Sequence, residues 1–307
     1  MAIERVADEL GYRPNGAARA MSSGKTGLID LLMSTSGGFS RITGSLLEGV
    51  HDALADADMH LSMSRLPDGQ LVNEGFMPKI LREYLCDGLL VNYTHHAPPQ
   101  MKKLITRYRI PVVWLNVKQP VDAVYPDDED GSRRATEYLL SLGHRRIAYL
   151  AYRHTGHYSE TDRARGYSSA MEEAGLEPHA AILDPAPFET VCDKPGQENR
   201  LPLVRQWLSQ PDRPTAVVTY GSEAAAVITA AAGLGLSVPG DLSVMSTAHA
   251  GLDPLGIGLT HMRQPGLAMG QQGVRMLLQK IASPAEQLPS RSLVYELAIG
   301  NTTQPSG

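Results

Sequence analysis

SRRATEYLLSLGHRRIAYL, residues 132–150, holds a helical pattern and a strand-like run within one short stretch. Apolar side chains recur at helical spacing over 132–142, and Ile147 to Leu150 form a compact apolar run. We therefore expect a helix followed by a buried strand, which is the repeating unit of a parallel α/β sheet.

The same rhythm of strand and helix runs through most of the chain. Apolar runs predict strands over 27–33, 60–64, 88–91, 111–115, 147–150, 181–183, 216–219 and 242–245. Helical spacing predicts helices over 42–57, 72–85, 100–108, 132–142, 163–174, 201–208 and 223–232. Such alternation forms βαβ units, whose right-handed crossovers place helices on both faces of a parallel sheet. Two successive runs predict two doubly wound lobes, with a ligand held in the cleft between them at the carboxyl ends of the strands.

Composition limits the classes to which the chain can belong. It has 307 residues, of which 42% are hydrophobic and 20% are charged, so a folded protein with two lobes is expected. The formal net charge of -5 argues against a body that binds nucleic acid over its whole surface. Any DNA contact must therefore come from a small local element. The two cysteines, Cys86 and Cys192, give no disulfide or metal framework.

Neither an export signal nor a membrane span is visible. The first residues, MAIERVADEL, carry charges every few positions, and no apolar run is long enough to cross a bilayer. We therefore expect a cytoplasmic protein with no membrane partner. A periplasmic solute-binding protein is disfavoured, because it needs an export signal.

Signatures of catalysis and of cofactor binding are missing. The sequence contains no GxSxG, HExxH, phosphate-binding Walker loop or GxGxxG after a strand, so we expect no enzyme and no cofactor. His95-His96 and the pair His154 and His157 lack acidic or cysteine partners at ligand spacing, so no metal site is predicted. The acidic run 127–130 resembles a cation site, but it opens a helix, where most of these acids are expected to cap free N–H groups.

Two further stretches carry functional information. In residues 9–21 a helix ends at Gly11, a turn passes through Pro14, and a short alanine-rich helix begins at Asn15. The second stretch, residues 162–167, reads DRARGY and follows a strand and a loop. We expect Arg163 there at a helix N-terminus facing the cleft, where a guanidinium can bind hydroxyls or carboxylates in a bidentate manner.

At these residues the chain resembles the LacI-type family of bacterial transcription regulators. Residues 10–15, LGYRPN, resemble the junction between the family's helix-turn-helix module and its hinge helix. Residues 135–148 resemble its most recognisable internal run, and 162–167 match its R-x-x-G-aromatic element. Further matches lie at 238–244 and 259–270. The matches follow the family's order and span nearly the whole chain.

The resemblance implies an α/β, periplasmic-binding-protein-like type I fold with three crossover segments. The expected lobes are 27–143 with 260–284, and 144–259 with 285–307, preceded by a remnant of the head plus hinge in 1–26. A homodimer is implied, together with a small-molecule effector related to carbohydrate and operator DNA when the full head is present. The resemblance also places Asn15, Ala18, Arg19 and Met21 in the DNA hinge.

The sequence departs from the family pattern in three places. Only the last helix of the head, about residues 3–10, precedes the hinge, so this chain alone should not read bases in the major groove. Ala248 and His249 stand where the family often has a ligand-binding Asp, and Gly221-Ser222 stand where an Asn-Asp pair is common. Arg163 would thereby lose a partner, which leaves an anionic effector, such as a sugar phosphate or acid sugar, as an expectation.

Positions at strand ends and family matches give the candidate effector-binding residues. They are Arg41, Ile42, Thr43, Asn92, Tyr93, Asn116, Asp127, Arg163, Phe188, Tyr220 and His249. Arg163 is the strongest single candidate, Arg165 is expected to be solvated or paired with an acid, and Tyr167 should turn towards the core.

The leading hypothesis is a ligand-responsive transcription regulator, and two alternatives stay open. A solute-binding or sensor protein of the same fold would lack DNA function, and the hinge-like segment disfavours it. An enzyme on a doubly wound sheet is the other alternative, because fold alone does not fix function.

Overall fold

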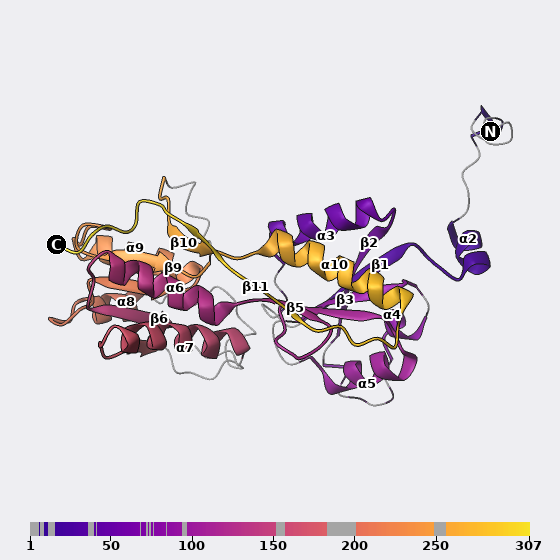
Figure 1. Ribbon diagram of the computed structural model, residues 1–307, viewed down its shortest axis with the longest axis horizontal. Helices are drawn as coiled ribbons and strands as arrows, with labels where there is room; N and C mark the ends of the chain where they lie inside the picture. Colours follow the sequence, from indigo (N-terminus) through magenta and orange to yellow (C-terminus); the bar gives the residue numbers. More distant parts are fainter. Residues whose placement is uncertain are drawn as a thin grey trace.

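The chain folds into two lobes that lie side by side in the computed structural model (Figure 1). The structure describes residues 6, 9–11, 16–35, 40, 42–67, 69–71, 73, 75, 77–83, 85–93, 97–151, 157–182, 201–248 and 256–307. The first lobe contains β1 (Leu28–Ser34), α3 (Gly44–Asp56), β2 (His60–Leu66), α4 (Lys79–Arg82), β3 (Gly88–Asn92), α5 (Pro99–Tyr108), β4 (Val112–Leu115), β5 (Ala123–Pro126), α10 (Gly266–Ala282) and β11 (Arg291–Leu293). The second lobe contains α6 (Asp128–Ser141), β6 (Ile147–Ala151), α7 (Tyr158–Glu173), β7 (His179–Ile182), α8 (Leu201–Leu208), β8 (Ala216–Thr219), α9 (Ser222–Gly233), β9 (Ser243–Ser246), β10 (Thr260–Arg263) and β12 (Glu296–Ala298).

Each lobe is built on one six-stranded sheet. The strand order is β11-β5-β4-β3-β1-β2 in the first lobe and β12-β10-β9-β8-β6-β7 in the second. The described strands pair in parallel, apart from the antiparallel pair of β10 and β12. This architecture confirms the predicted pair of doubly wound lobes.

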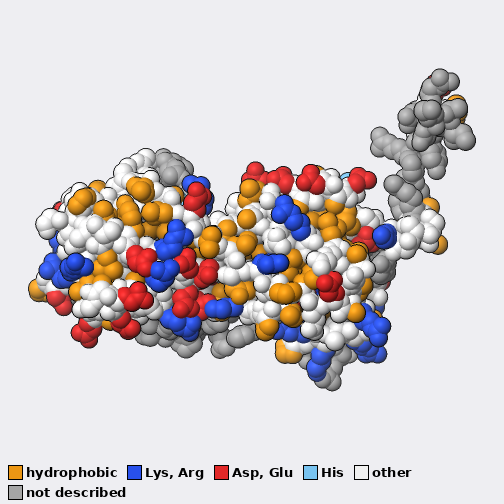
Figure 2. Space-filling view, in the orientation of Figure 1, with side chains coloured by type: hydrophobic (Ala, Val, Ile, Leu, Met, Phe, Trp, Pro, Cys, Tyr) orange, Lys and Arg blue, Asp and Glu red, His pale blue; other side chains and the backbone are white. Residues whose placement is uncertain are grey.

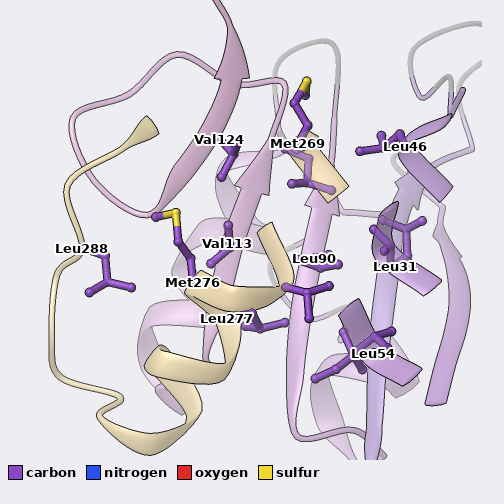
Figure 3. Close-up of a cluster of buried hydrophobic side chains, with 14 residues drawn as sticks. Leu31, Leu46, Leu54, Leu90, Val113, Val124, Met269, Met276, Leu277 and Leu288 are labelled. Carbon is purple, nitrogen blue, oxygen red and sulfur yellow. The ribbon is translucent and has the colours of Figure 1, made fainter. Parts of the chain in front are cut away.

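Apolar clusters cover both faces of each sheet, as the crossover rule requires. On one face of the first sheet, α10 inserts Met269, Met276 and Leu277 against Leu31 and Leu90 of the central strands (Figure 3). A second cluster lies on the opposite face under α4 and α5. In the second lobe, α8 and α9 cover one face and α6 and α7 the other.

The sheets divide the chain at points that differ from the predicted lobe ranges. The helix α6 belongs to the second lobe, because it packs against α7, so the first crossover lies at Asp127 rather than after 143. The strand β10 pairs within the second sheet, whereas β11 pairs with β5 of the first. The described lobes are thus 28–126 with 266–293, and 128–263 with 296–307. The helical spacing of 132–142 could not reveal which sheet the helix covers.

Two predicted helices also need correction. The helix expected over 72–85 is reduced to the single turn α4, since Gly75 and Pro78 interrupt the pattern before it. The helix expected from Arg163 begins five residues earlier, where His157 caps α7 by accepting a hydrogen bond from the Ser159 backbone N–H. Arg163 therefore lies in the second turn of the helix and not at its first residue.

The outer face of α3 is charged rather than apolar. Leu46, Val50 and Leu54 are buried against the sheet, whereas Glu48, Asp52 and Asp56 are exposed. Figure 2 shows acidic side chains gathered along this edge of the first lobe. The described outer face of this helix is therefore acidic.

The hinge segment forms the helix α2 (Gly16–Ser23), which lies apart from the first lobe (Figure 1). Ala18 is exposed, and the Met21 side chain is 89% exposed. Asn15 and the side chain of Arg19 lie outside the described residues. Of the helix predicted over about 3–10, the described part includes a hydrogen bond from the Leu10 N–H to the Val6 carbonyl.

Candidate functional site

Arg163 occupies a nearly enclosed position on α7, with 6% of its surface exposed. Its Nη2 donates to the Ser159 Oγ at 2.8 Å, and its Nη1 lies 3.6 Å from Asp128 Oδ1. The Tyr220 ring, which follows β8, covers the guanidinium at 3.9 Å from ring centroid to Cζ. An arginine stacked on an aromatic ring and facing a carboxylate is a built polar centre, not a solvated surface side chain.

Asp128 is the acidic half of this centre and is also buried. The Tyr295 hydroxyl donates to its Oδ1 at 2.9 Å, and Gln264 Nε2 donates to that hydroxyl at 3.2 Å. Burial raises the pKa of the Asp128 carboxyl to about 6, although Arg163 and the Tyr295 hydrogen bond act in the opposite direction. The Asp128 carboxylate thus forms a buried ion pair with Arg163. Although Ala248 supplies no carboxylate to Arg163, Asp128 gives this arginine an acidic partner that the sequence did not predict.

A path of hydrogen bonds leads from Arg163 to the first lobe. The Ser159 Oγ that accepts from Arg163 lies 2.7 Å from His157 Nδ1, and His157 Nε2 lies 3.1 Å from the Asn116 carbonyl. A carbonyl can only accept, so Nε2 carries the proton, and Nδ1 then accepts from the Ser159 hydroxyl. Burial lowers the pKa of His157 to about 4, which keeps this ring neutral near pH 7.

The beginning of α7 makes further contacts with the loop after β4. The Tyr158 hydroxyl donates to Asn116 Oδ1 at 3.2 Å, and Lys118 Nζ lies 2.5 Å from Asp162 Oδ2. Asn116 has a positive φ of 59°, a left-handed conformation that asparagine tolerates better than most residues. The helix that carries Arg163 is therefore also an element that holds the second lobe against the first.

The remaining candidates in the first lobe lie in varied surroundings. Asn92 ends β3 and is buried, and its carbonyl accepts from the Ser40 hydroxyl at 2.7 Å. Tyr93 is buried inside the apolar cluster under α4 and α5, and Ile42 packs against the cluster under α10. Neither apolar contact suggests a side chain directed at a ligand.

Two candidates serve as helix caps. Thr43 Oγ1 accepts from the Leu46 N–H and begins α3, whereas Asp127 Oδ1 accepts from the Asp130 N–H and begins α6. Both side chains satisfy backbone N–H groups at the ends of helices. Three further candidates, Arg41, Phe188 and His249, lie outside the described residues.

The neighbours of Arg163 in the motif at 162–167 behave as predicted. Arg165 is half exposed and pairs with Glu129 at 3.0 Å, and the Tyr167 hydroxyl donates to the Ile147 carbonyl from inside the core. A Cβ at Gly166 would lie 2.0 Å from the Glu129 carbonyl oxygen, so this glycine lets α6 and α7 touch. That contact brings Asp128 to Arg163.

The described residues contain neither a candidate metal site nor a candidate membrane helix. In the described parts of the chain, no group of three or more His, Cys, Asp or Glu side chains is placed to hold a metal ion. No described helix is both long and apolar enough to cross a membrane.

Comparison with known proteins agrees with this architecture. A family model for the periplasmic binding protein-like domain matches residues 136–303. The HTH-type transcriptional repressor PurR of Vibrio vulnificus is 26% identical over 312 residues, which cover 98% of this chain and 89% of that protein. The lac repressor dimer bound to operator and the anti-inducer ONPF has a TM-score of 0.76 at 21% identity, covering 98% of this chain and 89% of that one. A LacI family regulator from Enterococcus faecium with bound ribose has a TM-score of 0.72 at 19% identity, covering 91% and 100%.

The chain therefore belongs to the periplasmic binding protein-like family. Its relatives there are LacI-type repressors, and this chain is the effector-binding region of a ligand-responsive transcription regulator of that type.

Proposed function

We propose that this protein binds a small carbohydrate-related effector where its two lobes meet, and that this binding changes its affinity for operator DNA. One observation carries the proposal, namely the path from Arg163 through Ser159 and His157 to Asn116. An effector that binds the Arg163 guanidinium acts on the helix that contacts the other lobe. Such a ligand has different affinities for different lobe orientations, which is what a shift in DNA affinity requires.

The proposed effector site is centred on Arg163 and Tyr220 in the second lobe. Asn92 and Asn116 complete it from strand ends of the first lobe, and Asp128 is added from the structure. Ile42, Thr43, Tyr93 and Asp127 stay as weaker proposals, because their described contacts already explain them as packing or capping residues. Arg41, Phe188 and His249 keep the proposed role that the sequence suggests.

Dimerisation and operator binding are proposed by analogy. The related lac repressor structure contains a dimer on operator DNA, and two-fold symmetry suits the recognition of two half-sites. Since a regulator of transcription acts on the chromosome, we place the protein in the cytoplasm. Sedimentation at micromolar concentration should give about twice the 33.2 kDa mass of one chain. A monomer under these conditions would count against the proposal.

A chimera tests the coupling between the effector and DNA. The helix-turn-helix head of the lac repressor would precede residue 15 of this chain, and binding to the lac operator would be followed by fluorescence anisotropy with and without sugars. We expect operator binding and a change of at least fivefold in affinity with one sugar. A matched chimera with Arg163→Lys should bind the operator but lose much of the response. A chimera that binds a sugar while its operator affinity stays constant would instead favour a sensor without DNA function.

A further inference from the structure

The Arg163–Asp128 pair is not fully satisfied by the protein. Of the residues that the structure describes, none provides a hydrogen-bond partner for Arg163 Nε or for Asp128 Oδ2. Both side chains are more than 90% buried, and buried charged groups normally find partners for all their polar atoms. The Tyr158 hydroxyl donates to Asn116 and also lies near Asp128, where it stabilises the charged carboxylate, so Arg163 Nε and Asp128 Oδ2 are the donor and acceptor open to a ligand at this centre.

A donor beside an acceptor matches the chemistry of hydroxyl groups. A hydroxyl can donate to the Asp128 carboxylate and accept from the Arg163 N–H, whereas a carboxylate or phosphate oxygen can only accept. Tyr220 is the most exposed member of the centre, at 37% of its surface. Access to the guanidinium therefore requires the Tyr220 ring to move or to become part of the ligand contact.

The balance of charge at the centre also opposes an anion. The positive charge of Arg163 is matched by Asp128, and that of Lys118 by Asp162. Asp162 also lies 3.6 Å from Arg165, whose other partner, Glu129, forms with it a half-exposed ion pair outside the centre. The described side chains therefore leave no excess positive charge at the centre. An anionic ligand would lose its hydration and meet the Asp128 carboxylate without a net gain.

We propose that Asp128 is the charge-selecting residue of the effector site, so that the effector is a neutral polyhydroxy compound and not a sugar acid or sugar phosphate. The inference rests on the proposed effector function and deepens it. It replaces the expectation of an anionic effector, which rested on the absence of an aspartate at position 248.

Matched sets of ligands test this selection. The probes are ribose with ribose 5-phosphate, glucose with glucose 6-phosphate and glucuronate, and galactose with galacturonate, first by thermal shift and then by calorimetry. We expect a neutral sugar to bind the wild-type protein at least tenfold more tightly than its charged counterparts. Asp128→Asn keeps the shape of the side chain and removes its charge. The neutral-to-acid ratio, which is the affinity for the neutral sugar divided by the affinity for its charged counterpart, should therefore fall at least tenfold in this variant.

Glu129→Gln provides the matched control. It removes one negative charge from the neighbouring position of α6, whose side chain pairs with the exposed Arg165, so the neutral-to-acid ratio should stay as in the wild type. A melting temperature measured for each variant separates loss of selectivity from loss of folding.

A change of pH provides a second measurement without any substitution. Burial raises the pKa of Asp128 to about 6, so its carboxyl is largely neutral at pH 5, whereas glucuronate and galacturonate stay charged. The groups facing it are Arg163, Asp162 and Tyr158 from α7 and Tyr295 from the segment between β11 and β12. The wild type should therefore discriminate less against the acid at pH 5 than at pH 8, and Asp128→Asn should not.

Three results would overturn the proposal. A sugar acid or phosphate that binds the wild type as tightly as the neutral sugar would exclude charge selection. An unchanged neutral-to-acid ratio in Asp128→Asn would show that Asp128 does not select against charged ligands. Failure of every probe to bind would reject the neutral polyhydroxy class, while the response of the chimera to other compounds would still decide the regulator function separately.

Discussion

Replacement of Gly166 by alanine should loosen the contact on which the Arg163 centre depends. The added Cβ would lie 2.0 Å from the Glu129 carbonyl oxygen and 2.9 Å from the Arg133 backbone nitrogen. Both neighbours are backbone atoms of α6, so no rotation of a side chain can relieve the overlap. Since ordinary contacts of a Cβ begin at 3.4 Å, the two helices must separate by more than 1 Å at this point.

The expected loss follows from two opposing effects. Alanine is favoured over glycine inside a helix by about 0.8–1.0 kcal/mol. Overpacking of this kind costs about 1–3 kcal/mol, with the upper end expected when backbone must move. The free energy of unfolding should therefore fall by about 1–2 kcal/mol, and the melting temperature of the second lobe by about 2–8 °C.

Calorimetric melting of wild type, Gly166→Ala and Gly44→Ala would measure this effect. Gly44 begins α3 and has open space at its Cβ position, so its variant should be as stable as the wild type or slightly more so. Because separation of the helices also moves Asp128 from Arg163, Gly166→Ala should weaken effector binding as well. A Gly166→Ala protein that melts at or above the wild-type temperature would refute the packing argument.

Three further outcomes are expected. Arg163→Ala should weaken effector binding by about ten- to a hundredfold or more in calorimetry, because charged hydrogen bonds are worth about 1.5–3 kcal/mol each. Arg165→Ala is the control and should change the affinity little. Equal affinities in wild type and Arg163→Ala would show that Arg163 does not bind the effector. In a form that carries a complete head, Met21→Gly should weaken specific operator binding while effector affinity stays constant, since an apolar wedge in the minor groove is lost; unchanged operator affinity would reject the hinge assignment. His157 stays neutral in the fold, with a pKa of about 4, so the unfolded chain binds more protons and stability falls as pH drops from about 6.5 towards 4. His157→Gln should reduce this loss between pH 7 and pH 5 in urea unfolding, and a variant as acid-sensitive as the wild type would contradict it.

The sequence was sufficient to predict the two sheets and the surroundings of Arg165 and Tyr167. Alternating apolar runs and helical spacing depend on local patterns, which the sheets preserve. The glycine at 166 and the aromatic residue at 167 also have local meanings, since one permits close packing and the other fills a core. Such local features can be predicted from the neighbouring sequence, without knowing which distant residues pack against them.

The partner of Arg163 could not be found in this way. From the sequence alone, either Asp127 or Asp128 could cap the N–H groups at the start of the helix. Only the packing of α6 on α7 directs the Asp128 side chain towards Arg163. Its hydrogen-bond donor Tyr295 lies 167 positions further along the chain. The length of α4 and the lobe to which α6 belongs were missed for a related reason, because periodicity does not identify the surface that a helix covers.

The late position of α10 in the sequence has a consequence during translation, because the polypeptide leaves the ribosome from its N-terminus. The strands β1 to β5 and the helix α3 emerge early, but α10, which covers the same face of the sheet beside α3, comes only after nearly all of the second lobe. The strand β11, which closes the edge at β5, emerges later still. The part of this apolar face that α10 covers therefore stays exposed until synthesis is almost finished, which makes the nascent first lobe more prone to aggregation during that interval.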